Sequence, residues 1–63
     1  MRVLIVDDNA IVRMGLNRVL DRIEGVDVVA EAGDGVEAIE VAAAFAPDIV
    51  LLDVRMPRMD GLE

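Results

Sequence analysis

The chain has 63 residues, a formal charge of −7 and a hydrophobic content of 56%. A chain of this size forms at most one domain of marginal stability, and because it has no Cys and no His, neither disulfides nor zinc can stabilise it. Its 6 basic residues against 13 acidic ones leave no basic surface for nucleic acid or anionic lipid. No apolar run reaches the roughly 18 residues of a membrane span. We therefore expect a cytoplasmic chain without direct nucleic-acid or membrane contacts.

The residue types that are missing restrict the chemistry further. The sequence contains no Ser, Thr, Tyr, His, Cys or Lys, so hydroxyl, thiol, imidazole and amine chemistry are excluded within these residues. Carboxylates, Asn, Arg and backbone groups remain. Because carboxylate oxygens suit hard cations such as Mg²⁺, a functional site is to be sought among the acidic residues.

The first half of the sequence predicts a strand, a helix and a second strand. Residues 3–6 are apolar and rich in β-branched side chains, which indicates a strand covered on both faces. Apolar residues with helical spacing then predict an amphipathic helix that stops near Gly25: Val12, Leu16, Val19, Leu20 and Ile23. Segment 27–32 carries Asp27 and Glu31 on one face, as expected for a strand at the edge of a sheet.

The second half predicts a helix, a third strand and a final loop, at residues 36–46, 49–52 and 54–63. Asp34 is placed to cap the helix, and Pro47 is expected to end it. The third strand is apolar throughout and ends at Asp53. The pattern βαβαβ with short connections predicts an α/β fold, in which parallel strands are joined by right-handed crossovers and helices cover the sheet.

Carboxylates follow two of the predicted strands. Asp7 and Asp8 come after the first strand and Asp53 after the third, and ligands of such sheets bind outside the carboxyl ends of the strands. Two carboxylates about 4 Å apart repel by roughly 4 kcal/mol at an effective dielectric constant of 20, which a divalent cation offsets. A carboxylate can also accept a phosphoryl group as a nucleophile. The three acids therefore predict a magnesium-dependent phosphoryl site.

Three segments resemble the receiver domain of two-component response regulators: Val-Leu-Ile-Val-Asp-Asp at 3–8, Leu-Leu-Asp at 51–53 and Asp-Val-Arg-Met-Pro-Arg-Met-Asp-Gly at 53–61. The segments at 7–16 and 29–35 are similar to the NarL/FixJ class of transcriptional regulators. The resemblance covers the whole chain. It implies the βαβαβ half of a doubly wound, flavodoxin-like parallel sheet with strand order 2-1-3, and residues 1–63 are then an incomplete receiver domain.

The same resemblance implies roles for individual residues. Asp53 is expected to be the phosphoacceptor. Magnesium is expected to contact Asp8, Asp53 and the main-chain carbonyl of Arg55, while Asp7 assists through a water molecule. The implied partner is a sensor histidine kinase, and DNA would be bound through an absent helix-turn-helix domain. The family's Ser or Thr after the fourth strand and Lys after the fifth, which contact the phosphoryl group, are not among these residues.

The remaining polar residues have simpler interpretations. Asn9 is expected to cap the first helix, and Asp34 and Asp60, each beside a glycine, are expected in turns or caps. The arginines are expected to be exposed, on the polar side of the first helix or in the final loop: Arg13, Arg18, Arg22, Arg55 and Arg58.

Two other functions remain open alternatives. One is an aspartate-nucleophile phosphatase, although such enzymes place a second Asp two residues after the nucleophile, where this chain has Arg55. The other is a receiver-like interaction module that is never phosphorylated. Within these 63 residues, the apolar strand 49–52 is expected at an open sheet edge, which invites self-association.

Overall fold

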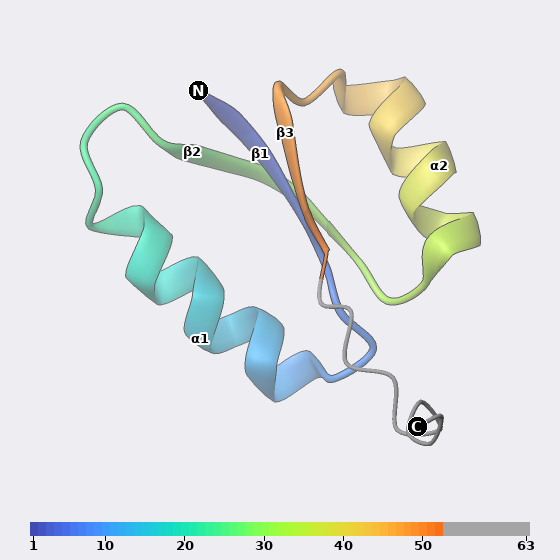
Figure 1. The fold of residues 1–63 in the computed structure, drawn as a ribbon, viewed down its shortest axis with the longest axis horizontal. Helices are drawn as coiled ribbons and strands as arrows, with labels where there is room; N and C mark the ends of the chain where they lie inside the picture. Colours follow the sequence, from blue (N-terminus) through green and yellow to red (C-terminus); the bar gives the residue numbers. More distant parts are fainter. Residues whose placement is uncertain (53–63) are drawn as a thin grey trace, which may run out of the picture.

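A three-stranded parallel sheet organises the chain, of which the computed structural model describes residues 1–52. The elements in chain order are β1 (Arg2–Val6), α1 (Ala10–Asp21), β2 (Asp27–Ala32), α2 (Gly35–Phe45) and β3 (Ile49–Leu52). The sheet order is β2-β1-β3 and both pairings are parallel, with α1 and α2 on opposite sides of the sheet (Figure 1). The predicted βαβαβ pattern and the strand order 2-1-3 are confirmed.

Strand β1 is the centre of the molecule. Its four apolar residues, Val3 to Val6, are at most 3% exposed, which agrees with the prediction of a strand covered on both faces. Leu4 and Val6 form a core cluster with Ala32, and side chains of α2 pack against that cluster. Because side chains alternate along a strand, Val3 and Ile5 face the side of the sheet that α1 covers. Burial of each such side chain contributes about 1.5–3 kcal/mol to folding.

Strand β2 departs from the predicted alternation. Its register against β1 shifts by one residue, so that Val28 pairs with Val3 but Ala30 pairs with Leu4. Asp27 therefore lies beside Arg2, whereas Glu31 lies beside Ile5, and these partners belong to opposite faces of β1. The edge position predicted for β2 is confirmed. The prediction that Asp27 and Glu31 share one face is wrong, because the bulge turns Glu31 toward α1.

The helix boundaries follow from local capping. Helix α1 ends at Asp21, earlier than predicted, because its last turn tightens: the Arg22 N–H donates to the Val19 carbonyl at 3.2 Å. Gly25, with φ +87°, instead forms the turn that leads into β2. Helix α2 is displaced by one residue from its predicted range and ends before Pro47, with Ala46 as a left-handed cap at φ 48°. No described helix has the length and hydrophobicity needed to cross a membrane.

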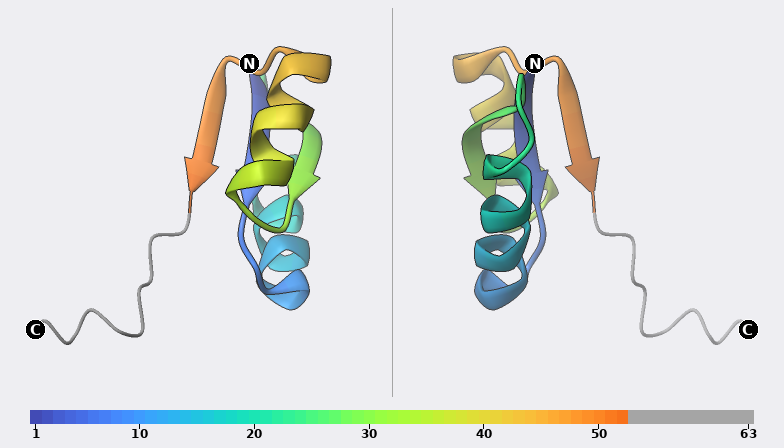
Figure 2. Two further views of the ribbon diagram at one scale, coloured as in Figure 1. Left: turned by 90° about the vertical axis from the view of Figure 1, so that its right-hand side faces the viewer. Right: turned by 90° about the vertical axis from the view of Figure 1, so that its left-hand side faces the viewer.

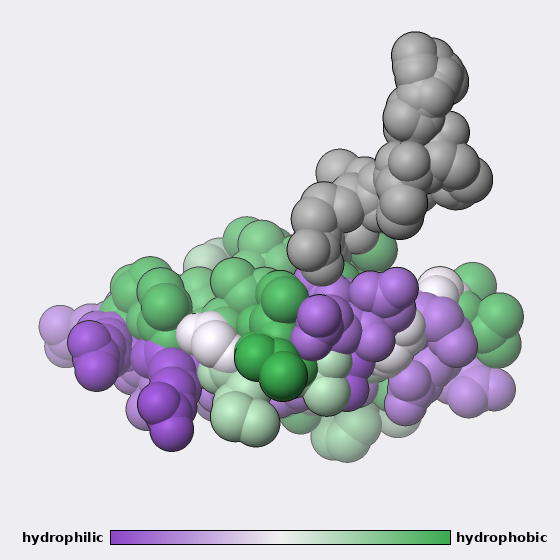
Figure 3. All heavy atoms as spheres, turned by 90° about the horizontal axis from the view of Figure 1, so that it is seen from below, coloured by the Kyte–Doolittle hydropathy of each residue, from purple (hydrophilic) through white to green (hydrophobic). Residues whose placement is uncertain are grey.

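Among residues 1–52, β1 is the only helix or strand that β3 contacts. Strand β3 makes no close backbone contact with either helix, and in the two side views it stands apart, to one side of both helices (Figure 2). All four of its residues are exposed, from 37% at Leu51 to 58% at Leu52. Seen from the carboxyl ends of the strands, a broad hydrophobic area adjoins hydrophilic side chains (Figure 3). Within the polypeptide 1–63, the outer edge of β3 is thus an apolar strand edge without a partner among residues 1–52.

We expect an isolated polypeptide of residues 1–63 to associate through this edge, because unpaired strand edges template further pairing. Light scattering after size exclusion should show a species larger than a monomer, and Val50→Lys should shift it toward the monomer. Ile39→Lys is the matched control, because it adds the same charge at a 74% exposed position of α2. A monomer at every concentration would contradict the expectation.

Candidate functional site

The loop after β1 carries two neighbouring acidic residues that differ in their exposure to solvent. Asp7 is 3% exposed; its N–H donates to the Ala32 carbonyl at 3.1 Å, and its Oδ1 accepts from the Asn9 N–H at 2.8 Å. Asp7 thus continues the pairing of β1 with β2 and closes the turn into α1. Asp8 is exposed. The two acids therefore differ in exposure: Asp7 is buried and holds the loop together, whereas Asp8 is exposed.

Asn9 joins this loop to helix α1. Its side-chain oxygen accepts hydrogen bonds from the N–H groups of Ile11 at 2.9 Å and Val12 at 3.3 Å. The prediction that Asn9 caps this helix is confirmed. The positive end of the helix dipole consequently lies next to the two acidic residues, where it favours negative charge.

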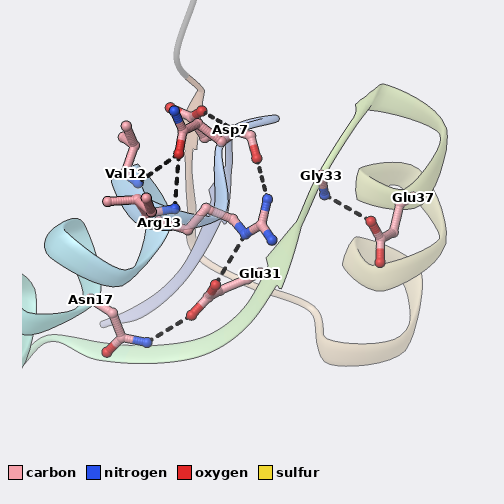
Figure 4. A network of polar contacts seen from close by, with 9 residues as sticks. Asp7, Val12, Arg13, Asn17, Glu31, Gly33 and Glu37 are labelled. Atoms are coloured by element: carbon pink, nitrogen blue, oxygen red, sulfur yellow. Dashed lines mark hydrogen bonds and ion pairs between the residues drawn. The ribbon is translucent and has the colours of Figure 1, made fainter.

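Arg13 supports the same loop from the helix. One terminal nitrogen of its guanidinium donates to the Asp7 carbonyl, and Nε donates to Glu31 Oε1 at 3.2 Å. The other oxygen of Glu31 accepts from Asn17 at 2.9 Å, as Figure 4 shows. The Arg13 side chain is only 21% exposed. The prediction that Arg13 is exposed is therefore wrong, because the bulge in β2 brings Glu31 within its reach.

A hollow of about 230 Å³ opens at the carboxyl ends of the strands. Its lining comes from the ends of β1 and β3, from the loop after β1 and from the turn between β2 and α2: Val6, Asp7, Asp8, Gly33, Asp34, Gly35 and Leu52. The structure thus brings Asp7 and Asp8 together at the predicted rim. Asp34 caps α2 as predicted, since its Oδ1 accepts from the Glu37 N–H at 2.8 Å.

The turn at 33–35 was not predicted to be part of this hollow. A signal was present, because the turn follows an edge strand parallel to the first strand and must therefore lie at the same rim. The turn is held in place by Glu37, whose Oε1 accepts from the Gly33 N–H at 2.7 Å (Figure 4).

The third acid of the predicted trio, Asp53, lies outside the described residues, as do Arg55, Arg58 and Asp60. What the structure does show is the register: Val6 pairs with Leu52, and in the sequence each of these residues is followed directly by Asp. Among residues 1–52, no three acidic side chains are grouped closely enough to hold a metal ion. The described part of the site is a pair of carboxylates that line the hollow. Carboxylate oxygens are ligands that hard cations such as Mg²⁺ prefer, so this part of the site fits such a cation.

Residues 3–63 match the response regulator receiver domain family. The chain belongs to this family. Its sheet, its helix caps and its acidic loop are therefore those of a receiver domain.

Two curated relatives illustrate the range of the family. The chain is 53% identical over 62 residues to the transcriptional regulatory protein PdtaR of Mycobacterium tuberculosis. The aligned segment covers 98% of this chain but only 30% of PdtaR. The chain is also 45% identical over 62 residues to a protein-glutamate methylesterase/protein-glutamine glutaminase of Geobacter metallireducens. This alignment covers 98% of this chain and 17% of that protein. The chain thus spans less than a third of either relative.

Solved structures show the same fold. The response regulator domain of Thermotoga maritima CheB superposes with a TM-score of 0.82 at 44% identity, covering 90% of this chain and 42% of that chain. A structure of the P1 domain of CheA3 in complex with CheY6 from R. sphaeroides gives a TM-score of 0.81 at 40% identity, covering 97% of this chain and 48% of that chain.

We expect Asn9→Ala to lower the free energy of unfolding by about 1 kcal/mol, because two N–H groups of the first turn of α1 lose their acceptor. Asn9→Asp keeps a side-chain oxygen at the cap and should be close to the unchanged protein. Urea unfolding of the full-length protein measures both. Equal stability of the Ala variant would show that the cap contributes nothing.

Proposed function

We propose that this chain is the phosphoacceptor half of a cytoplasmic receiver domain, and that Asp53 takes a phosphoryl group from a sensor histidine kinase. The observation that supports it most is the pairing of Val6 with Leu52. Two strands that are level at their carboxyl ends are each followed in the sequence by Asp. Asp8 is exposed beside the hollow that Leu52 also lines, so the route from solvent to this rim is open.

The proposed reaction is a direct phosphoryl transfer. A carboxylate oxygen of Asp53 attacks the phosphorus, a new P–O bond forms, and the bond from phosphorus to the donor nitrogen breaks, so that the electron pair leaves with the donor histidine. Asp8, Asp53 and the Arg55 main-chain carbonyl would hold Mg²⁺, and Asp7 would act through water. When bound, the cation neutralises charge on the transferred group. Asp7 is already fixed by its contacts with Ala32 and Asn9.

The partners and the output belong to the same proposal. The likeness to CheY6, crystallised with the P1 domain of CheA3, supports a kinase-type partner. The motifs at 7–16 and 29–35 support a regulator of the NarL/FixJ class, which would bind DNA through a helix-turn-helix domain outside these residues. Phosphorylation would then switch transcription, and these residues would not themselves be an enzyme. A methylesterase among the relatives makes the identity of the output domain the point to establish first.

We expect the full-length protein to gain one phosphoryl group when it is incubated with Mg²⁺ and acetyl phosphate, and Asp53→Ala to gain none. Mass spectrometry detects the added group. Asp21→Asn is the matched control, because Asp21 lies at the far end of α1, and it should be labelled like the unchanged protein. Full labelling of Asp53→Ala would remove Asp53 from the proposal. The polypeptide 1–63 should show little labelling, because the family's Ser or Thr and its Lys are not among its residues.

We also expect Asp8→Asn to weaken Mg²⁺ binding by at least about tenfold, because one ionised oxygen ligand is replaced by a neutral amide. Calorimetric titration of the full-length protein with Mg²⁺ measures the change. Asp21→Asn again controls for the loss of one negative charge. An unchanged affinity in Asp8→Asn would leave Asp8 without a metal role, whatever the outcome at Asp53.

A further inference from the structure

We propose that Arg13 is a positioning residue, which sets the orientation of the peptide unit that carries Asp8. The role within phosphoryl transfer rests on the function proposed above, but the positioning itself does not. Arg13 lies one turn into α1 and joins two strands through one guanidinium: it donates to the Asp7 carbonyl after β1 and to Glu31 on β2.

The bond to the Asp7 carbonyl acts directly on Asp8. The Asp7 carbonyl and the Asp8 N–H belong to one peptide unit, which is planar. A donor that fixes the carbonyl direction therefore also fixes the plane from which the Asp8 side chain departs. The next peptide is held by Asp7 Oδ1, which accepts from the Asn9 N–H. Asp8 is thus exposed as a side chain but lies between two restrained backbone positions.

Glu31 holds the guanidinium in place. It lies on the α1 side of the sheet because of the bulge in β2, and Asn17 occupies its second oxygen. The side chains of the ion pair are 21% and 35% exposed, and Arg13 is the more buried of the two. A Cβ placed on Gly33 would come within 3.6 Å of the terminal nitrogen of Arg13. The guanidinium therefore lies beside the turn after β2 as well as bonding to the acidic loop (Figure 4).

Arginine suits this position for a geometric reason. Its planar fork offers donors in several fixed directions, and here two of them serve acceptors on different strands. A lysine has a single charged centre and can keep one of these contacts with good geometry, but not both. Arg13→Lys should therefore restore part of what Arg13→Gln loses.

The test uses four variants of the full-length protein: Arg13→Gln, Arg13→Lys, Glu31→Gln and Arg18→Gln. Arg18 lies on the exposed side of the same helix, so its variant controls for the lost charge. Nitrogen-relaxation NMR without metal reports on the Asp8 amide, calorimetry gives the dissociation constant for Mg²⁺, and acetyl phosphate gives the labelling rate. Thermal unfolding checks that each variant folds.

For Arg13→Gln we expect greater mobility at the Asp8 amide, unchanged mobility in α2, and Mg²⁺ binding and labelling reduced about tenfold, as for other residues that orient metal ligands. Glu31→Gln and Arg13→Lys should give smaller losses in the same direction, and Arg18→Gln none. If Arg13→Gln does not fold, Glu31→Gln and Arg13→Lys decide the question.

Two results would overturn the proposal: wild-type mobility at Asp8 in the folded Arg13→Gln variant, or an increase in mobility that is as large in α2 as at Asp8. If the unchanged protein is not labelled on Asp53, the proposed function fails instead. The NMR comparison then still decides whether Arg13 positions Asp8, since it requires neither metal nor phosphoryl donor.

Discussion

The burial of β1 on both of its faces is the constraint on which the rest of the structure depends. Val3 to Val6 are almost completely inaccessible, and a strand in that state needs a neighbour on each edge and a helix on each face. Parallel crossovers supply both the neighbouring strands and the covering helices. Because β2 and β3 run parallel to β1, all three strands end at the same rim of the sheet, with β1 ending just before Asp7 and β3 ending at Leu52. This topology makes the ends of β1 and β3 level, since Val6 pairs with Leu52, and in the sequence each of these two residues is followed directly by Asp.

The same constraint gives two adjacent acids different roles. Asp7 is the first residue beyond the buried strand, and its N–H still pairs with β2, so its side chain is drawn into the loop. Asp8 is one residue further and is exposed. A pair of acids after a buried strand therefore divides into an inner residue that organises the loop and an outer one that can meet a ligand. Composition alone treats them as equivalent, and the distinction comes from where the pairing ends.

Features that depend on a few neighbouring residues could be predicted from the sequence. The strand 3–6 follows from its β-branched residues, and the caps at Asn9 and Asp34 follow from side chains that bond N–H groups within one turn. The Arg13 contact could not be predicted, because it depends on the bulge in β2, which changes the face on which Glu31 lies. A shift of one residue reverses every later side chain of a strand. The sequence predicts the end of α1 too late in the chain, because Gly25 favours a helix stop, whereas in the structure Gly25 forms the turn that follows the helix.

Under the proposed function, this half of the fold accepts the phosphoryl group and does not itself produce the output. In the described part of the acidic rim, Asp7 is held by main-chain pairing with Ala32, and the adjoining turn is held by the Asn9 cap. Both contacts are made within residues 1–52. A rim made in this way can serve different output domains without being rebuilt. That is consistent with relatives named both as a transcriptional regulator and as a methylesterase. Differences that depend on the output are then expected on outward surfaces, away from Asp8 and from the Arg13 contact that holds its peptide unit.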